Sequence, residues 1–316
     1  MPRERYFYRI FGVIIESDFP FPGLASFPSL QYSSGERIFI SSCKNLAPRR
    51  TKSGWNTFYG LDYWFSSDQR LAIIQSSETG VFRIDFQRKR IDWSSVGEIS
   101  QEYTCVLLRV RIVGFLVSHL IPALLLHASV VVRNGKGIAL GGMVAAGKST
   151  LTASCLNDGF SLLSDDIAAL QPNNGHFLLH PGVPEFRLWP WTARRLNPPG
   201  MKGEYLAPEI KKKKFLLGPD APWRFTNKPV PLSCLYLLSR KKKMEGIRIE
   251  SLKGRKALMG VLENIYNPMI KNPNVLGQQL EIASRLIQKV PVKRLIYPSG
   301  FSHLSKVRQA ILKDLA

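Results

Sequence analysis

Alternating apolar and polar positions dominate the N-terminal part of the chain and predict short β-strands. The candidate strands occupy residues 6–16, 37–40, 71–75, 81–86 and 88–93. Residues 76–80, between two of these runs, are rich in Ser and end in Gly80, which indicates a hairpin turn. The pattern predicts a β-rich N-terminal region over residues 1–98.

After residue 98 the apolar spacing first becomes helical. One helix face would hold Val106, Leu107, Val110, Val113, Phe115, Leu116 and Leu120. Residues 124–132 then predict a strand, Asn134-Gly135 a type I′ turn, and residues 137–141 the return strand. Further strands are expected at residues 160–163, 167–170, 177–180, 232–238 and 292–297, and helices at 149–156, 258–266, 278–287 and 304–315. Residues 198–228 are polar, basic and turn-rich, and predict a mobile loop. The fold class is α/β (α+β), with a mixed sheet in a second region over residues 99–316.

Residues 142–150 have the spacing G-x-x-x-x-G-K-[ST], which is typical of loops that bind nucleotide phosphates. The loop consists of Gly142, Met143, Val144, Ala145, Ala146, Gly147, Lys148, Ser149 and Thr150. Its glycines allow successive backbone N–H groups to converge on phosphate oxygens. Lys148 places a positive charge on the β/γ-phosphates, and Ser149 offers a hydroxyl to Mg²⁺. An apolar strand before the loop and a short helix after it supply the required context.

Two adjacent carboxylates, Asp165 and Asp166, follow an apolar segment 17 and 18 residues beyond Lys148. A nucleotide site needs a carboxylate at a strand end for its metal ion. Two carboxylates indicate a division of labour, one toward the metal and one toward an attacking hydroxyl. The competing interpretation is an exposed Ser-Asp-Asp turn.

His127 lies 21 residues before Lys148, within the predicted strand 124–132. Counted from the Asn134-Gly135 turn, it falls near the phosphate-side end of the hairpin. It is either a buried core histidine or a partner of the catalytic base or a proton shuttle.

The chain of 316 residues contains 44 Lys and Arg against 23 Asp and Glu, a net charge of +21. Basic runs at residues 211–214 and 240–243 are interpreted either as solvated loops and helix ends or as contacts with an anionic partner. That partner could be an acidic peptide, a nucleic acid or a membrane surface. Nucleic acid is not expected, because the runs contain no aromatic residues and no nucleic-acid motif accompanies them.

Four widely spaced cysteines (Cys43, Cys105, Cys155, Cys234) predict neither a disulfide framework nor a metal site. The N-terminus lacks the apolar core of a signal peptide, and a cytoplasmic location is expected. The most apolar run, residues 112–126, is too short to span a bilayer. We expect it to form a buried helix followed by a buried strand.

His127-Ala128-Ser129, the loop with Lys148 and Ser149, and the Asp165-Asp166 pair resemble, in order and spacing, the catalytic domain of HPr kinase/phosphorylase and its relatives. The resemblance covers residues 100–300. Three other segments are similar to the HPr-kinase-like proteins of peptide natural-product clusters, such as the kinases of lasso peptide precursors. These segments are Tyr8 to Gly12, His180-Pro181-Gly182 with residues 186–190, and residues 290–295.

The resemblance implies an HPr-kinase-like P-loop catalytic domain over residues 99–316. It implies an ATP- and Mg²⁺-dependent kinase acting on a serine hydroxyl of a peptide or protein, including a natural-product precursor peptide. Lys148 would bind phosphate, and Ser149 and Asp165 would hold Mg²⁺. Asp166 would be the catalytic base, supported by His127. Relatives of this kind often assemble, so a homo-oligomer is a further expectation.

Two departures separate the chain from the bifunctional members of that family. Thr150 stands where they usually carry an acidic residue, and their second glycine- and arginine-containing signature has no match. Both argue against HPr as the acceptor and against phosphorylase activity. The basic run at residues 211–214 would then serve a different, acidic acceptor or the ATP phosphates. The alternatives are a non-catalytic nucleotide-binding regulatory module and a small-molecule kinase.

Overall fold

The computed structural model describes residues 4–43, 46, 55–58, 61–76, 80–95, 101–196, 200–205, 211–217, 221–266 and 272–316. The chain divides into two compact units. The first comprises Met1–Pro122 and Asn267–Gln278, and the second comprises Ala123–Tyr266 and Gln279–Ala316. This division assigns the helical segment after residue 100 to the first unit, whereas the sequence boundary at residue 98 places it with the second region. That boundary stays a prediction.

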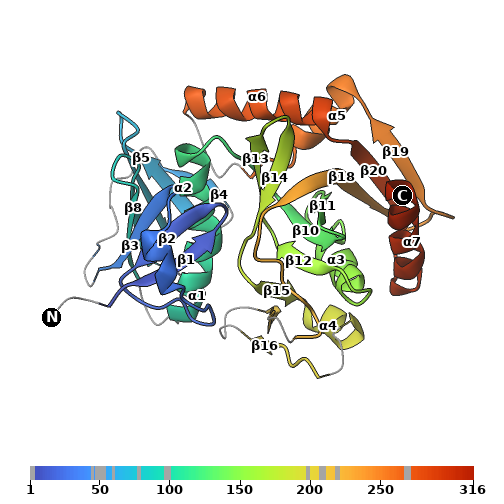
Figure 1. The fold of residues 1–316 in the computed structure, drawn as a ribbon, viewed down its shortest axis with the longest axis horizontal. Helices are drawn as coiled ribbons and strands as arrows, with labels where there is room; N and C mark the ends of the chain where they lie inside the picture. Colours follow the sequence, from blue (N-terminus) through green and yellow to red (C-terminus); the bar gives the residue numbers. More distant parts are fainter. Residues whose placement is uncertain are drawn as a thin grey trace. The chain divides into compact units, whose positions relative to one another are not determined.

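The first unit contains an eight-stranded sheet in the order β1-β2-β3-β8-β7-β6-β5-β4 (Figure 1). Its strands are β1 (Tyr6–Ile10), β2 (Val13–Ser17), β3 (Arg37–Ser42), β4 (Asn56–Phe58), β5 (Leu61–Phe65), β6 (Leu71–Ser76), β7 (Gly80–Asp85) and β8 (Arg90–Ser94). The predicted strands are present, except that residues 6–16 form two antiparallel strands joined by a turn at Phe11 and Gly12, and β4 and β5 are additional. The turn residues 77–79 lie outside the described part of the chain.

The helical segment of this unit consists of α1 (Gln101–Leu107), a π-helical turn (Leu108–Ile112) and α2 (Val113–Leu120). Residues Tyr103–Leu120 are long and apolar enough to cross a membrane, but 78% of that stretch is buried inside the protein. The ring of Phe115 lies 5.9–6.2 Å from those of Tyr63 and Phe65 on β5 and of Phe86 just after β7. Packing against its own sheet accounts for the apolar composition of this helix.

The second unit is built on a mixed nine-stranded sheet (Figure 1). Its main order is β12-β10-β11-β18-β14-β13-β9, with β20 beside β18 and β19 at the edge. The strands are β9 (Leu124–Leu126), β10 (Ala128–Arg133), β11 (Lys136–Gly141), β12 (Ser161–Ser164), β13 (Ala168–Asn173), β14 (His176–His180), β18 (Val230–Lys241), β19 (Arg248–Leu252) and β20 (Val292–Pro298). The helices are α3 (Lys148–Leu156), α4 (Pro190–Leu196), α5 (Gly254–Leu262), α7 (Leu304–Leu315) and the part of α6 (Pro273–Lys289) from Gln279 onward. The predicted α/β class with a mixed sheet is confirmed.

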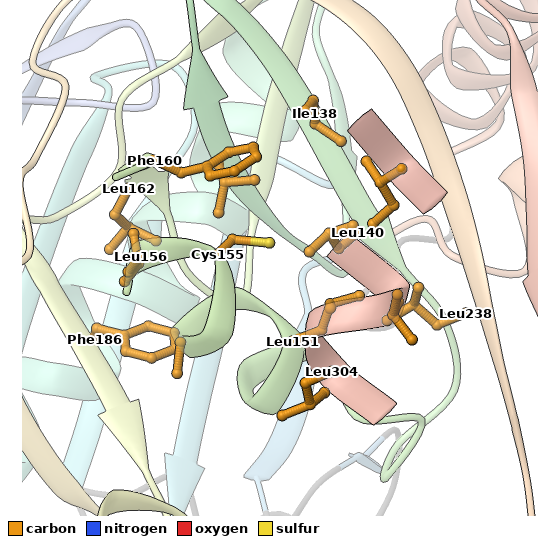
Figure 2. Packing of buried hydrophobic residues seen from close by; sticks show 14 of the residues in the cluster. Ile138, Leu140, Leu151, Cys155, Leu156, Phe160, Leu162, Phe186, Leu238 and Leu304 are labelled. Carbon is orange, nitrogen blue, oxygen red and sulfur yellow. The ribbon is translucent and has the colours of Figure 1, made fainter. Parts of the chain in front are cut away.

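Alternate residues of the central strands enter two separate cores, as the period of two in a strand requires. On β11, Ile138 and Leu140 join the core that holds α3, α4 and α7, whereas Ala139 joins the opposite core. That opposite core holds α5 and the C-terminal part of α6. Figure 2 shows Leu151, Cys155 and Leu156 of α3 gathered with the side chains of the first core. Helices therefore cover both faces of the sheet, and α3 is fixed by the sheet beneath it.

The loop expected over residues 198–228 contains regular structure, which corrects that prediction for the described residues. β17 (Lys213–Leu216) pairs with both β15 (Glu185–Leu188) and β16 (Glu204–Tyr205) in a three-stranded sheet. Phe215 is buried because it packs against Trp223, with ring centroids 5.3 Å apart. Residues 197–199, 206–210 and 218–220 lie outside the description.

The predicted strand at residues 124–132 is two strands, which corrects the placement of His127 in mid-strand. β9 pairs with β13, whereas β10 pairs with β11 and β12. His127 occupies the junction between them. The two-residue turn at Asn134-Gly135 is confirmed, with positive φ at both positions.

Leu151→Ala should lower the free energy of unfolding by about 2–5 kcal/mol. Leu151 is fully buried on α3, and truncating it leaves a cavity in the first core. Leu280→Ala on α6 is the control, since Leu280 is 48% exposed. Urea denaturation of both variants measures the difference. Equal losses in the two variants would show that α3 is not anchored as described.

Candidate active site

Strand directions bring three separate sequence segments to one edge of the sheet of the second unit. β10 runs antiparallel to both β11 and β12, so β11 and β12 end where β10 begins. The register pairs Ala128 with Gly141 and Val130 with Ser164. The residues just beyond these positions are His127, Gly142 and Asp165. The structure therefore brings together the three sequence features on which the site prediction depends.

The loop after β11 has the backbone conformation that its glycines permit. Gly142 and Gly147 have φ of 140° and 97°. A Cβ at Gly147 would lie 2.7 Å from the hydroxyl of Tyr297, and one at Gly142 would lie 3.1 Å from the carbonyl oxygen of Leu238. Both positions need glycine for space as well as for conformation. α3 begins at Lys148, so its N-terminal end adjoins the loop.

Three side chains from distant parts of the sequence hold the loop in place. Asn264 Oδ1 accepts a 2.6 Å hydrogen bond from the Gly142 N–H. The Tyr297 hydroxyl donates to the Ala146 carbonyl at 2.8 Å, and Arg240 Nη2 donates to the Ala145 carbonyl at 2.9 Å. Arg240 and Tyr297 lie opposite each other on the parallel strands β18 and β20.

Lys148 is buried and points back along the loop. Its Nζ donates to the carbonyl oxygens of Gly142 at 2.7 Å and Met143 at 3.3 Å. Burial lowers the pKa of Lys148, and the carboxylates of Asp166 and Asp165 partly oppose that effect. The adjacent loop tip is open, since Met143 is 74% exposed. An ammonium group held by carbonyl oxygens can exchange them for phosphate oxygens, which are stronger acceptors.

Asp165 is buried at the end of β12 and is held from two sides. The Ser129 hydroxyl donates to its Oδ1 at 2.8 Å, and the Arg187 backbone N–H donates to its Oδ2 at 3.4 Å. Burial and the neighbouring charge of Asp166 raise the pKa of Asp165 to about 6, although Arg187 acts in the opposite direction. A carboxylate that is poorly compensated in this way is suited to a cation.

Asp166 is less buried and has a different partner. Its φ of 64° turns the chain sharply between β12 and β13. Arg187 Nη2 lies 2.8 Å from its Oδ2. Burial alone would lower the pKa of Arg187, but the carboxylates of Asp166, Glu185 and Asp165 raise it. The two aspartates thus have separate environments within the turn between β12 and β13: Asp165 is buried, whereas Asp166 is half-buried and paired with Arg187.

Two further predicted residues lie at this edge without a demonstrated role. His127 is half-buried, and its backbone N–H donates to the carbonyl oxygen of Asn264 at 2.7 Å. Ser149 is half-buried in the first turn of α3. Among the described residues, no three His, Cys, Asp or Glu side chains form a metal-binding group. The proton-transfer role of His127 and the metal-binding role of Ser149 stay predictions.

The sequence predicts no role for four residues that shape the site: Ser129, Arg187, Asn264 and Tyr297. Lys212 and Arg240 belong to the two basic runs, for which contact with an anionic partner is one of the predicted alternatives. The positive charge of Lys212 lowers the pKa of both Lys148 and Asp165, so this lysine lies near them. Lys214 in the same run is buried on β17. The interpretation of this run as solvated loop is therefore wrong for Lys214, whereas Lys212 is half-buried outside any strand.

No protein-family model and no curated protein sequence matches the chain. Among solved structures, the Hpr(Ser) kinase/phosphatase from Coxiella burnetii aligns with 61% of this chain and 99% of its own length. The identity is 13% and the TM-score is 0.33. A similarity this distant leaves the function to be inferred from the site itself.

Asp165→Asn should stabilise the protein above pH 6 and have little effect near pH 4. The folded-state pKa of about 6 exceeds the ordinary value, so the native protein keeps a proton that the unfolded chain releases. Stability is therefore lost as the pH rises from about 4 to about 6. Removing the carboxylate should therefore raise the free energy of unfolding by about 1–3 kcal/mol at pH 8. Urea denaturation at pH 4.5 and pH 8 measures this, and an equal difference at both pH values would contradict it.

Proposed function

We propose that this protein is an ATP- and Mg²⁺-dependent kinase that transfers the γ-phosphoryl group to a serine hydroxyl of a peptide or protein. The observation that supports this most directly is the convergence of a phosphate-type loop with two carboxylates in different environments. The loop would bind the phosphates of ATP. One carboxylate would bind the metal ion, and the other would accept the proton of the serine hydroxyl. Phosphoryl transfer needs mainly this positioning and charge neutralisation.

Each residue has a distinct part in the proposed reaction. The loop N–H groups and the start of α3 bind the phosphates, and Lys148 turns from the carbonyl oxygens of Gly142 and Met143 to a phosphate oxygen. Asp165, oriented by Ser129, and the Ser149 hydroxyl would hold Mg²⁺, which neutralises phosphate charge when bound. Asp165 fits that task because its pKa is raised by burial, a penalty that a cation would relieve.

Asp166 is the proposed base that accepts the serine proton. Arg187 orients its carboxylate through the 2.8 Å ion pair and is a positioning residue in this scheme. Asp166 is also the more exposed of the two aspartates, which suits a group that must meet an acceptor from solution. His127 is proposed to support it. The sequence resemblance points to a natural-product precursor peptide as the acceptor. We also propose a cytoplasmic location, with which the four free thiols agree.

Asp166→Asn should keep ATP affinity and lower phosphoryl transfer by about 10²–10⁴-fold, because the base is lost while the phosphate loop is intact. Asparagine tolerates the positive φ at this position, so the turn should survive. Lys148→Ala should instead weaken ATP binding. The assay combines ATP titration with mass spectrometry of candidate serine peptides, including precursor peptides encoded nearby.

Asp158→Asn, just beyond the end of α3, is the matched control and should leave transfer unchanged. Full function in Asp166→Asn would favour a nucleotide-binding module without catalysis. Absence of added phosphate on every acceptor tested would count against the kinase assignment.

A further inference from the structure

A cavity in the second unit lies outside the residues to which phosphate binding is assigned above. It measures about 570 Å³ and lies between α4 and the short helix η3 (Phe301–His303). Its walls are Trp191, Arg194 and Arg195 from one side and Phe301 and Ser302 from the other. The cavity thus combines two cationic side chains with two aromatic rings.

The aromatic walls are fixed relative to each other yet open to solvent. The rings of Trp191 and Phe301 meet edge to face with centroids 5.6 Å apart, and the Arg195 guanidinium lies 5.4 Å from the centre of the Phe301 ring. Trp191 is nevertheless 49% exposed. Arranged aromatic and arginine side chains that stay exposed are the residue types that dominate binding energy at interfaces.

The charge of this cavity is not neutralised by the described part of the chain. Arg194 and Arg195 are exposed, and the ion pairs of the described residues include neither of them. Guanidinium groups only donate hydrogen bonds, and their geometry matches a carboxylate.

Both walls are tethered to the active site by short segments. Trp191 follows Arg187, the partner of Asp166, by four residues, and Phe301 follows Tyr297, which bonds the phosphate loop, by four residues. Four residues span at most about 14 Å. An extended peptide advances roughly 3.3 Å per residue, so a span of about 14 Å corresponds to about four peptide positions. Allowing for the length of the Arg187 side chain, a peptide with its serine at Asp166 is expected to reach the cavity roughly three to six positions away.

We propose that this cavity binds an acidic side chain, Asp or Glu, of the acceptor peptide, flanked by an apolar residue that packs on Trp191 and Phe301. This inference rests on the proposed function, and it specifies the substrate class. The arginines provide the selectivity for acid, and the aromatic rings provide the apolar contact.

The test uses the full-length protein and serine peptides with acetylated and amidated ends, so that only side-chain carboxylates are compared. Each peptide carries one Asp at a position from one to eight residues away on either side of the serine, with the Asn peptide as its pair. We expect Asp to lower the KM about tenfold or more relative to Asn at positions three to six on one side. Arg194→Gln/Arg195→Gln should abolish that preference without changing kcat or the KM for ATP.

Arg255→Gln on the exposed face of α5 is the control for loss of one positive charge and should behave like the unmodified protein. Arg195→Glu should shift the preference from Asp toward Lys at the same peptide position. Equal use of Asp and Asn peptides by the unmodified protein would overturn the proposal. So would a change in the KM for ATP alone in the arginine variants, which would identify a nucleotide subsite, or an equal loss in Arg255→Gln.

Peptide binding without ATP, followed by the fluorescence anisotropy of labelled peptides, separates this proposal from the proposed function. Acid-selective binding that needs Arg194 and Arg195, without phosphate transfer, would support the cavity and contradict the kinase. Transfer to serine without acid preference would support the kinase and contradict the cavity.

Discussion

The antiparallel pairing of β10 with both β11 and β12 is the constraint on which the site depends. It makes β11 and β12 run in the same direction, so the phosphate loop and the aspartate pair leave the sheet at one edge. It also places Ser129 within 2.8 Å of Asp165. A register slip of one residue would turn Ser129 to the other face and exchange the residues of β10 between the two cores. Packing of the two cores therefore holds the chemistry in register.

The same edge contains groups that oppose folding. Lys148 and Asp165 are both buried. Burial lowers the pKa of Lys148 and raises the pKa of Asp165, so it favours the uncharged form of each side chain. Sequences optimised for stability avoid such groups, whereas sites that must bind charged ligands retain them. Packing of α3 in the first core offsets this cost, and the carbonyl oxygens of Gly142 and Met143 accept hydrogen bonds from Lys148. The sheet and its helices thus supply the stability. The groups that oppose folding lie at the edge of the sheet that carries the proposed function.

The parts of this architecture that were predictable have local signals. Asn134-Gly135 encodes its turn, and the loop of residues 142–150 and the Asp165-Asp166 pair are recognisable within a few residues. The parts that were missed depend on long-range contacts. Asn264 reaches Gly142 across 122 positions, and Tyr297 reaches Ala146 across 151. The break at His127 arises because β9 and β10 pair with different strands, and an apolar run carries no mark of its partners. β17 was missed because its lysines obscure the strand pattern around a buried Phe215.

Some of the positive charges that make up the net charge of +21 lie near the candidate site. One basic run supplies Lys212, which acts on Asp165 and Lys148, and the other supplies Arg240, which bonds the phosphate loop. Both runs therefore contribute to the site and not only to solvation. Charges within the site act on buried groups, where salt screens them weakly, whereas Arg194 and Arg195 are exposed and would attract a partner in a salt-dependent manner. Ionic strength should thus affect binding of the proposed acidic peptide at the exposed arginines more than it affects the electrostatics around Asp165.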